Sequence, residues 1–509
     1  MRSTLYLSTP LRPWAFLLFA FAFLFFCLNV EAQSEGCDGA GNCYVRAGAT
    51  GSGTGADWNN AYTGLGAGTG QINPSSITRG VTYYFAAGNY NGGSAVSLTT
   101  ADSGTTTITL QAATVASHGT ATGWNNSYVG QAVLPPLYIE SDYWVINGAY
   151  RGSGSGYPAT DWRTGYGFKV YNNNGSNVPI STAAGLWVGP NTYPTSNNTV
   201  IEYVEVAGSG DTTGTYQDQA IEADQCENCV IQYNYLHDIG GTGLQIVAEA
   251  AGTDNAVVEY NWLQNNQSTP AEHGEGIGIK ASATGGNWNL TFAYNYLENM
   301  EGTGYIGTPD CSGCTGAWYF YGNVFFANTS EWHGNTSPQN GLSYAYIQYF
   351  GASGAGNQLN MTTIAFYNNT IYQLAAGMSQ PDCDAVNGGF ATVTNFYFQN
   401  NLVVNCRSAV VSAPTSGTLT QDHNSYFSVT NVSDTGTGVQ NVSGVIPFTS
   451  PSTNDLSLSQ DTAIWSSMNA PYNIDIIGAT RTSSRGAFQY VHPQGFSLTG
   501  GLLTGGSSN

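Results

Sequence analysis

A strand-like segment that ends beside an asparagine recurs along the middle of the chain, and this repeat constrains the fold more than any other feature. The seven equivalent asparagines are separated by 27, 34, 28, 46, 32 and 23 residues. A repeat of this length with occasional insertions is typical of a solenoid, in which each repeat packs on its neighbours. The equivalent positions are Asn234, Asn261, Asn295, Asn323, Asn369, Asn401 and Asn424.

Each repeat also contains a second short strand, at 220–224, 243–247, 276–280 and 304–308. Two or three short strands per repeat, separated by turns and without helical periodicity, indicate a parallel β-helix rather than a helical solenoid. The recurring asparagines fit an internal ladder at one corner, in which stacked amide side chains hydrogen-bond along the axis. We therefore expect them to be structural and assign them no catalytic role.

The two ends of the repeat region resemble a known superfamily. Residues 44–62 (YVRAGATGSGTGADWNNAY) resemble the N-terminal segment of many secreted bacterial β-helix proteins related to pectate lyases. Residues 485–490 (RGAFQY) resemble their C-terminal segment. The resemblance covers roughly 44–490 and implies an all-β fold, the right-handed parallel β-helix solenoid. It implies no single activity, because this scaffold carries lyases, hydrolases, esterases, epimerases and non-catalytic adhesins.

The first 32 residues have the pattern of a secretory signal peptide. Arg2 and Arg12 form a positive region before an apolar run at 14–28, and residues 30–32 (VEA) fit a cleavage site. The run is shorter than the roughly 20 residues of a membrane span, which disfavours the alternative of an uncleaved anchor. We therefore expect bacterial export to the extracellular space, one β-helix domain at 33–490 and a flexible Gly/Ser-rich tail at 491–509.

The chain is strongly acidic, with 11 Lys and Arg against 32 Asp and Glu and a formal net charge of −21. Cleavage of the signal peptide would leave nine basic and 31 acidic residues. So few basic residues leave little counterion release to drive nucleic-acid binding. An acidic surface also repels polyuronates unless calcium or local basic residues compensate. Because 41% of the residues are apolar, the chain can bury a core. We expect a monomer that binds polysaccharide and no membrane.

Eight cysteines remain after the signal peptide, and an even number suggests disulfides in an exported protein. We expect neighbours to pair, as Cys37–Cys43, Cys226–Cys229, Cys311–Cys314 and Cys383–Cys406. The alternative is a zinc site made from the two CxxC motifs, which needs every sulfur about 2.3 Å from one metal. The motifs belong to coils three steps, or roughly 14 Å, apart. We therefore favour local disulfides.

The second strand of each repeat supplies the candidate site. Strand alternation predicts two outward rows, Glu222, Gln245, Gly278 and Ile306, and Asp224, Val247, Lys280 and Thr308. The predicted inward rows are Ile221, Leu244, Ile277 and Tyr305, and Ala223, Ile246 and Ile279. Asp224 and Lys280 are expected on the order of 10 Å apart, a gap that fits a sugar unit. On the asparagine-bearing strand, the predicted outward row is Glu202, Gln232, Glu259, Ala293 and Phe320.

These residue types suit a polysaccharide lyase, which needs a base beside a uronate carboxylate and positive charge to hold the resulting anion. Lys280, or His273 in the preceding loop, is the predicted base, and Glu275 lies beside them in sequence. Glu222 and Asp224 are the predicted calcium or substrate ligands. This plan resembles several β-helix lyases that combine a lysine base with calcium on neighbouring carboxylates. The predicted substrate-binding residues are Trp262, Gln245, His237 and Asp238.

Two other functions stay open. A glycoside hydrolase uses two carboxyl groups about 5 to 9.5 Å apart, here two of Glu222, Asp224, Glu272 and Glu275. A non-catalytic glycan-binding or surface protein would use the same fold for its stability alone. A structural interpretation also stays open, with Lys280 as a surface residue paired to Glu275 or Asp224 and the many aromatic residues as core.

Overall fold

The computed structural model describes residues 36–119, 121–152, 162–171, 184–189, 196–208, 219–224, 226–248, 253–266, 276–281, 284–300, 304–308, 312–328, 347–351, 360–373, 387–388, 392–406, 408–409, 416–462 and 468–490. The predicted signal peptide and tail lie outside these ranges. Within them the chain consists mainly of strands and turns, and no helix is long and apolar enough to cross a membrane.

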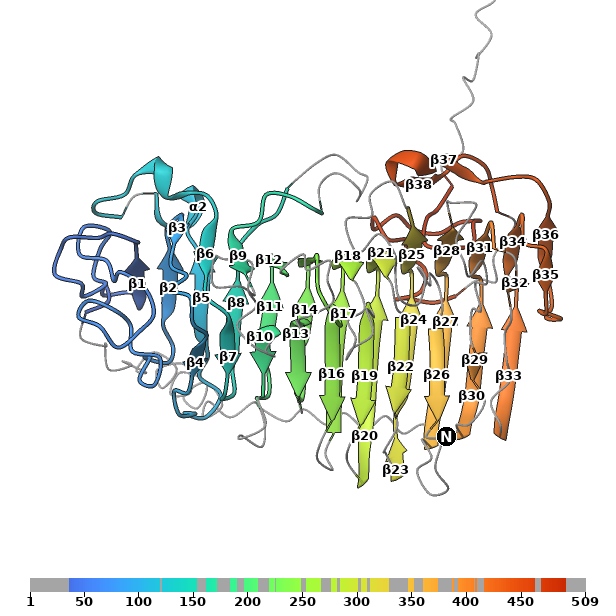
Figure 1. The fold of residues 1–509 in the computed structure, drawn as a ribbon, viewed down its shortest axis with the longest axis horizontal. Helices are drawn as coiled ribbons and strands as arrows, with labels where there is room; N and C mark the ends of the chain where they lie inside the picture. Colours follow the sequence, from blue (N-terminus) through green and yellow to red (C-terminus); the bar gives the residue numbers. More distant parts are fainter. Residues whose placement is uncertain are drawn as a thin grey trace, which may run out of the picture.

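Three long parallel sheets run along the length of the molecule (Figure 1). Each coil of the chain gives one strand to each sheet in turn, and neighbouring strands in a sheet come from successive coils. We name them sheet 1, sheet 2 and sheet 3, in the order in which a coil visits them. This arrangement is the parallel β-helix that the repeat predicts.

The strands are distributed as follows. Sheet 1 contains β4 (Val96–Leu98), β7 (Leu137–Ile139), β10 (Ala184–Val188), β13 (Gln219–Asp224), β16 (Leu244–Ala248), β19 (Ile277–Ala281), β22 (Gly304–Thr308), β26 (Ile347–Gly351) and β29 (Asn387–Gly388). Sheet 2 contains β1 (Asn42–Val45), β2 (Thr82–Phe85), β5 (Ile108–Ala112), β8 (Trp144–Asn147), β11 (Val200–Glu202), β14 (Val230–Gln232), β17 (Thr253–Glu259), β20 (Thr284–Ala293), β23 (Ser312–Thr315), β24 (Ala317–Tyr321), β27 (Asn360–Tyr367), β30 (Thr392–Gln399) and β33 (Ser416–Asp422).

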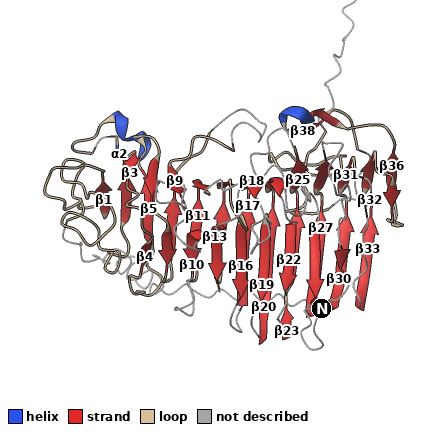
Figure 2. Cartoon of the chain, viewed as in Figure 1, coloured by secondary structure: helices blue, strands red, loops and turns tan. Residues whose placement is uncertain are grey.

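Sheet 3 contains β3 (Gly88–Asn89), β6 (Ala132–Leu134), β9 (Phe168–Tyr171), β12 (Val204–Ala207), β15 (Tyr235–His237), β18 (Trp262–Asn266), β21 (Tyr296–Met300), β25 (Val324–Ala327), β28 (Thr370–Gln373), β31 (Leu402–Val404), β34 (Ser425–Phe427) and β36 (Gln440–Val442). The remaining elements are short: β32 (Ser408–Ala409), β35 (Asn431–Val432), the hairpin of β37 (Phe448–Ser450) and β38 (Asp455–Leu458), helix α2 (Val115–His118) and 3-10 turns at Asn126–Tyr128 and Pro451–Thr453 (Figure 2).

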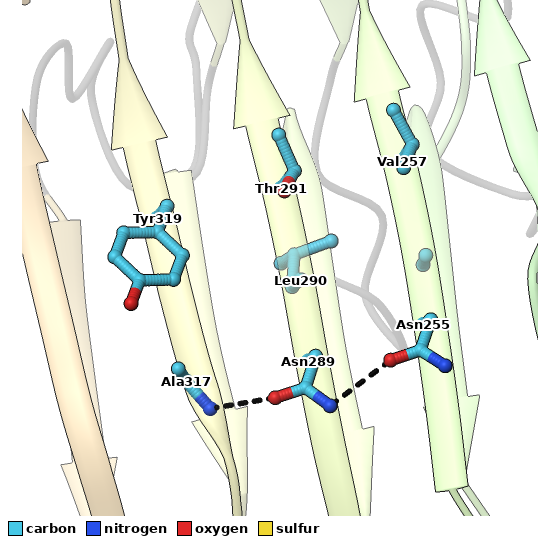
Figure 3. A pocket seen from close by; sticks show the side chains of 8 residues that line it. Asn255, Val257, Asn289, Leu290, Thr291, Ala317 and Tyr319 are labelled. Atoms are coloured by element: carbon cyan, nitrogen blue, oxygen red, sulfur yellow. Dashed lines mark hydrogen bonds between the residues drawn. The ribbon is translucent and has the colours of Figure 1, made fainter. Parts of the chain in front are cut away.

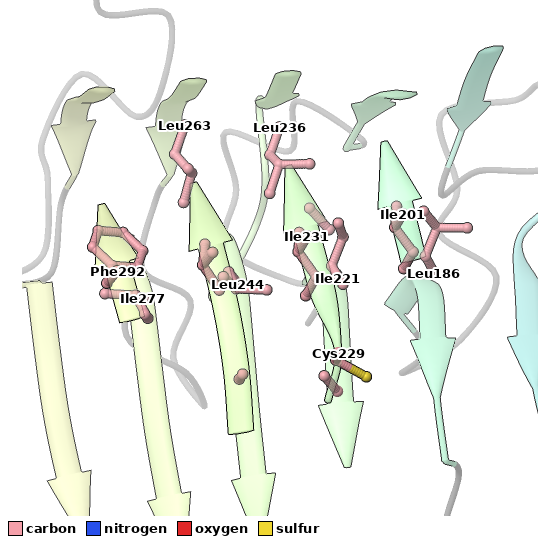
Figure 4. Close-up of a cluster of buried hydrophobic side chains, with 14 of the residues drawn as sticks. Leu186, Ile201, Ile221, Cys229, Ile231, Leu236, Leu244, Leu263, Ile277 and Phe292 are labelled. Carbon is pink, nitrogen blue, oxygen red and sulfur yellow. The ribbon is translucent and has the colours of Figure 1, made fainter. Parts of the chain in front are cut away.

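Alternation along each strand sends every second side chain into the interior. In sheet 2, Ile201, Ile231, Val258 and Phe292 pair in register across four coils, and each is at most 2% exposed. Rows from the three sheets meet inside the coil (Figure 4). Burying one such side chain contributes about 1.5–3 kcal/mol. Truncating Ile231 to alanine would cost about 2–5 kcal/mol, because the stacked coils leave a cavity they cannot close.

The corner between sheets 2 and 3 holds the predicted asparagine ladder, which is confirmed. From Asn234 to Asn424, each amide nitrogen donates to the Oδ1 atom of the next asparagine at 3.0–3.2 Å. The preceding coil lacks this asparagine, and there the backbone N–H of Val204 donates to Asn234 instead. All seven side chains are at most 1% exposed. The ladder therefore satisfies buried polar groups that would each cost about 1–3 kcal/mol if left unpaired.

A stack of tyrosines covers the outside of the same corner. Tyr203, Tyr233, Tyr260 and Tyr294 occupy the turn position after the sheet 2 strand, with φ between 55° and 58°. This left-handed conformation costs a non-glycine residue roughly 1–2 kcal/mol. The rings of successive coils stack with centroids 5.0–5.2 Å apart. Each stacked pair contributes about 0.5–1.5 kcal/mol, which offsets much of this conformational cost.

The C-terminal segment, residues 448–490, turns back over sheet 3. The Tyr296 hydroxyl in β21 donates to the carbonyl of Asn454 at 3.2 Å. Further along, the Ala487 N–H donates to the Thr370 hydroxyl in β28 at 2.8 Å. Arg485, within the motif at 485–490, donates to the Asn424 carbonyl at 2.9 Å. The segment therefore contacts sheet 3 from β21 to the last coils.

Two of the predicted disulfides are present, and the zinc alternative is not needed. The bonded pairs are Cys37–Cys43 and Cys226–Cys229, and Cys406 is also disulfide-bonded. Cys383, the predicted partner of Cys406, and Cys311, the predicted partner of Cys314, lie outside the described residues.

The predicted position of β22 in the rows of sheet 1 is wrong by one residue, so Tyr305 does not share the inward row of Ile277. β19 and β22 pair Gly278 with Tyr305. Tyr305 rather than Ile306 therefore continues the row of Gly278, and Thr308 does not share a row with Lys280. The segment GYIGT has glycines at 304 and 307 and two adjacent large apolar residues between them, so alternation alone cannot fix its register.

A second register prediction, in sheet 2, is also wrong because its strand lacks a clear alternation of polar and apolar residues. Ala293 pairs with Tyr321, so Tyr321 and not Phe320 ends the predicted outward row. Phe320 points into the core and is 1% exposed. The strand AWYFY is aromatic on both faces, which hides the alternation.

Candidate functional site

The predicted row on the outer face of sheet 1 is formed in register. Glu222 pairs with Gln245, and Gln245 pairs with Gly278. The Gln245 amide donates to the Glu222 carboxylate at 2.8 Å and accepts from the Gln219 amide at 3.0 Å. Gln245 is only 5% exposed. The amide predicted to bind substrate therefore links neighbouring side chains of the sheet.

The second predicted row in sheet 1 is Asp224, Val247 and Lys280, which also pair in register. Asp224 and Lys280 are thus two coils apart, as the sequence predicts. Asp224 is 2% exposed, and its carboxylate accepts a hydrogen bond from the Trp187 indole at 2.8 Å. For Lys280 the structure describes only the backbone, in β19.

The calcium role predicted for Glu222 and Asp224 stays a prediction. Calcium takes six to eight oxygen ligands, whereas here one carboxylate is bonded by an amide and the other by an indole. Within the described ranges, no group of three or more His, Cys, Asp or Glu side chains is arranged to hold a metal ion. We therefore derive no reaction step through calcium at these two residues.

Other residues predicted for the sheet 1 site are either outside the described residues or buried. Glu272, His273 and Glu275 belong to the connection between β18 and β19, outside the described residues. Trp262 in β18 is fully buried, stacked on Tyr296 with centroids 4.1 Å apart. Trp262 therefore offers no exposed ring face to a sugar here, in agreement with the core interpretation of these aromatic residues.

His237 and Asp238, at the end of β15, belong to a cluster on the outer face of sheet 3 and not to the sheet 1 rows. The Nδ1 atom of His237 lies 2.7 Å from the Asp238 carboxylate, and its Nε2 atom lies 3.2 Å from Glu205. Glu205 in β12 also forms an ion pair with Lys169 in β9. We name Lys169, Glu205, His237 and Asp238 the sheet 3 cluster.

Strand register brings this cluster together from three successive coils. Lys169 pairs directly with Glu205, and Glu205 pairs with Tyr235. His237 lies two residues beyond Tyr235 on the same face, within reach of Glu205. Three of the four cluster side chains are 13–14% exposed, and Asp238 is 31% exposed. The charges are thus largely removed from water but accessible from one side.

The pKa values of Glu205, His237 and Lys169 are each shifted towards the charged form. Burial raises the pKa of Glu205, but hydrogen bonds from His237 and Lys169 outweigh it and lower the pKa to about 2. Burial lowers the pKa of His237, yet bonding to Asp238 and Glu205 leaves it raised overall. The pKa of Lys169 is raised in the same way, because Glu205 outweighs burial. Gln131 adds a hydrogen bond to Glu205 at 2.8 Å.

The connection between β8 and β9 adds two arginines to this face of sheet 3. Arg151 lies over the Trp162 ring, 4.1 Å from its centroid, and donates to the Tyr260 carbonyl at 2.9 Å. Arg163 lies over the buried Trp262 ring at 5.1 Å. The charges of Arg163, Asp238 and Glu205 all act on the buried Tyr235 hydroxyl. The charges of Arg151 and Glu205 both act on the buried Tyr166 hydroxyl, so both arginines lie in the neighbourhood of the cluster.

A buried polar row continues from the cluster along sheet 3. The Tyr235 hydroxyl donates to Gln264 at 2.5 Å, and the Gln264 amide donates to Glu298 at 3.0 Å. Glu298 is fully buried and also accepts from Asn454 at 2.9 Å. Because Asn454 lies in the C-terminal segment, that segment meets the end of the row at β21.

Sequence reasoning found His237 and Asp238 but missed Lys169 and Glu205. β12 lies in the repeat copy that lacks the ladder asparagine, and β9 precedes every recognised copy, so neither strand had a positional marker. One signal was available. The chain has two lysines, and Lys169 occupies an outward position in the alternating strand FKVY.

No protein-family model matches the chain, and no curated protein matches it in sequence. Several solved structures are similar. Pectate lyase Pel9A is 12% identical with a TM-score of 0.38, covering 88% of this chain and 96% of its own. A PL6 alginate lyase in complex with a trisaccharide is 11% identical with a TM-score of 0.40, covering 81% and 87%. PfbA, a surface adhesin of Streptococcus pneumoniae, is 9% identical with a TM-score of 0.24, covering 71% and 85%. None of these likenesses carries an argument about the activity of this chain.

Proposed function

We propose that this protein is exported and acts on an acidic polysaccharide as a lyase, with its site at the sheet 3 cluster. The observation that carries the proposal is a concentration of positive charge. Arg151, Arg163 and Lys169 are three of the nine basic residues outside the predicted signal peptide. Lys169 and His237 share the Glu205 carboxylate, and Arg163 lies over the ring of Trp262, which pairs with Tyr235 beside the cluster. Local basic groups of this kind are what an acidic protein needs in order to bind a polyuronate.

The arrangement suits β-elimination. Asp238 accepts a hydrogen bond from Nδ1 of His237, which orients the ring and leaves Nε2 as the base. Nε2 takes the proton from carbon 5 of the uronate. The electron pair forms a double bond between carbons 4 and 5 as the bond from carbon 4 to the glycosidic oxygen breaks, and that oxygen takes a proton from water. Lys169 and Arg163 neutralise the carboxylate and the enolate-like anion.

Glu205 holds the site ready in the absence of substrate. Its carboxylate bridges Lys169 and His237, and its low pKa keeps it ionised at neutral pH. In the proposed reaction, the substrate carboxylate takes over the contact with Lys169, and Nε2 of His237 is freed from Glu205. Glu205 is therefore a positioning residue.

The sequence predictions supply the rival site. A lyase on sheet 1 would use Lys280 or His273 as base, with Glu222, Asp224 and Glu275 around it. A glycoside hydrolase or a non-catalytic glycan-binding protein are the rival functions. Each rival can be distinguished from the proposal by experiment. The rival functions give a different product or none, and the rival site predicts that different substitutions abolish product formation.

The deciding experiment is a product assay on the mature protein with a panel of acidic and neutral polysaccharides. Absorbance of the unsaturated product and release of reducing ends are followed together. Both signals rising on an acidic polymer, and both lost in Lys169→Ala and His237→Ala, support the proposal. Reducing ends without absorbance indicate a hydrolase. No product from folded protein indicates a binding protein and overturns the proposed lyase.

A further inference from the structure

The outer face of sheet 2 carries a hollow of about 330 Å³, formed by strands β17, β20 and β24 (Figure 3). It opens where a row of asparagines on the outer face is interrupted. Asn255 pairs in register with Asn289, and the next position of this row, in β24, is Ala317. The small side chain of Ala317 leaves space between Asn289 and the ring of Tyr319, which lies two residues further along β24.

The two amides beside the hollow are held in fixed orientations. Asn255 donates to Asn228 at 3.2 Å, and Asn289 donates to Asn255 at 3.0 Å. The backbone N–H of Ala317 then donates to Asn289 at 3.1 Å. A side-chain amide has two N–H donors and two acceptor lone pairs. Asn255 and Asn289 therefore each retain a donor and an acceptor for a ligand after these bonds are made.

We propose that this hollow is a binding site for a neutral sugar unit of a glycan chain. Tyr319 offers a half-buried ring on which the apolar face of a sugar can stack. The oriented amides and the hydroxyl of Thr291 suit the donor and acceptor pattern of sugar hydroxyls. The amides recur at the strand spacing of about 4.8 Å, so a chain running across the coils meets them in succession.

The charges around the hollow select a neutral ligand. No residue that lines it is basic or acidic. The carboxylate of Glu259 lies on the same face of β17, two residues beyond the lining residue Val257. It would repel a uronate. This site therefore differs in ligand class, and in sheet, from the proposed lyase site, and it would tether the protein to neutral glycans that surround its acidic substrate.

The test is affinity electrophoresis of the full-length mature protein in gels that contain a soluble neutral polysaccharide, such as a β-glucan, a xylan or a galactomannan. Ala317→Leu fills the hollow and keeps the backbone N–H that bonds Asn289. Tyr319→Ala removes the stacking ring. Thr418→Leu is the matched control, because Thr418 lies exposed on the same row at the far end of sheet 2.

We expect retardation by at least one neutral polymer, weakened roughly ten-fold in affinity by Ala317→Leu and by Tyr319→Ala, and unchanged in Thr418→Leu. Thermal unfolding of each variant verifies that it is folded. Absence of retardation by every neutral polymer overturns the proposal, as does wild-type affinity in both hollow variants. The readout is binding, so its failure leaves the lyase proposal standing. Conversely, loss of activity in Lys169→Ala leaves the hollow untouched.

Discussion

Sheet 3 and sheet 1 each place a carboxylate on their outer face, but the partners of the two carboxylates differ. Glu205 on sheet 3 is bonded to Lys169 and His237. Glu222 on sheet 1 accepts from the amide of Gln245, which in turn bonds Gln219. The first arrangement gathers ionisable groups whose pKa values are shifted towards the charged forms, and the second continues a ladder of neutral amides.

The difference teaches that in so acidic a chain the location of the basic groups is more informative than the location of the acids. Thirty-two acidic residues make pairs of carboxylates common by chance. Basic residues are scarce, so the pairing of Lys169 and His237 with one carboxylate, with Arg151 and Arg163 in the same neighbourhood, stands out. Perturbed ionisable groups gather at functional sites more often than elsewhere. The four predictions below test whether the two faces differ in this way.

The largest expected effect is the difference in activity between alanine variants of the two lysines. Lys169→Ala removes the charge that neutralises the substrate carboxylate and should lower kcat/KM by about 10²–10⁴. Lys280→Ala should change it by less than about three-fold. The initial rate of unsaturated product measures both, and Lys169→Arg, which keeps the charge, should retain measurable activity. The opposite ranking of the two alanine variants would move the site to sheet 1.

The second effect is on the pH profile. Because His237 must be neutral to act as base, the rate should rise with pH through its raised pKa, above the ordinary value of 6.5. Its contribution to stability has the opposite sign, since a raised pKa stabilises the fold at low pH and this stabilisation is lost as pH rises through the folded value. The variant His237→Gln should lose about 100-fold in rate, and its rate should no longer rise with pH in this range. We call this rise the rising limb of the pH profile.

Glu222→Gln provides the comparison for that profile. The variant changes a carboxylate on sheet 1 and leaves the sheet 3 cluster intact, so the rising limb should persist at the same pH. A limb that shifts in Glu222→Gln and persists in His237→Gln would assign the base to the other face.

The third effect is on folding stability. Glu205 has a pKa of about 2 against an ordinary 4.5, so its pairing stabilises the fold above about pH 4.5 and this is lost as pH falls towards 2. Glu205→Gln should cost on the order of 3 kcal/mol at pH 7 and little at pH 2. Glu222→Gln should cost less than about 1 kcal/mol. Urea unfolding at both pH values measures the difference, and equal costs for the two variants would contradict it.

The smallest expected effect is that of chelation. The positive charge at the sheet 3 cluster comes from side chains, and Glu222 and Asp224 already accept hydrogen bonds from protein donors. Activity should therefore stay within about two-fold after calcium is removed. Complete loss that calcium restores would show that the ion, rather than Lys169, supplies the charge.

The fold was predictable because its strongest signal is periodic. A buried asparagine at one corner of each coil from Asn234 to Asn424 marks the repeat directly, and each one is bonded to the next. Register was predictable only where polar and apolar residues alternate, as at Glu222 and Gln245 in sheet 1. It failed at Tyr305, where glycines remove the pattern, and at Phe320, where aromatic residues occupy both faces.

The sheet 3 cluster was predictable only in part, because it depends on contacts between distant segments. His237 and Asp238 are adjacent in sequence and follow a recognisable repeat, whereas Lys169 is 36 residues from Glu205. No marker aligned those earlier coils with the later ones. Whether a residue faces inward or outward depends on its own strand and can be read locally. To know which residues of other coils lie beside it, one must also know the lengths of all the intervening loops.

The return of the C-terminal segment over sheet 3 has a mechanical consequence. A solenoid normally frays from its ends, coil by coil, because each coil contacts only its neighbours. Here contacts at Tyr296, Thr370 and Asn424 fasten one segment to coils that are far apart along the axis. The last coils cannot peel away one at a time until this segment detaches. We therefore expect the C-terminal coils to unfold together in a single cooperative step, under mechanical force or during proteolysis.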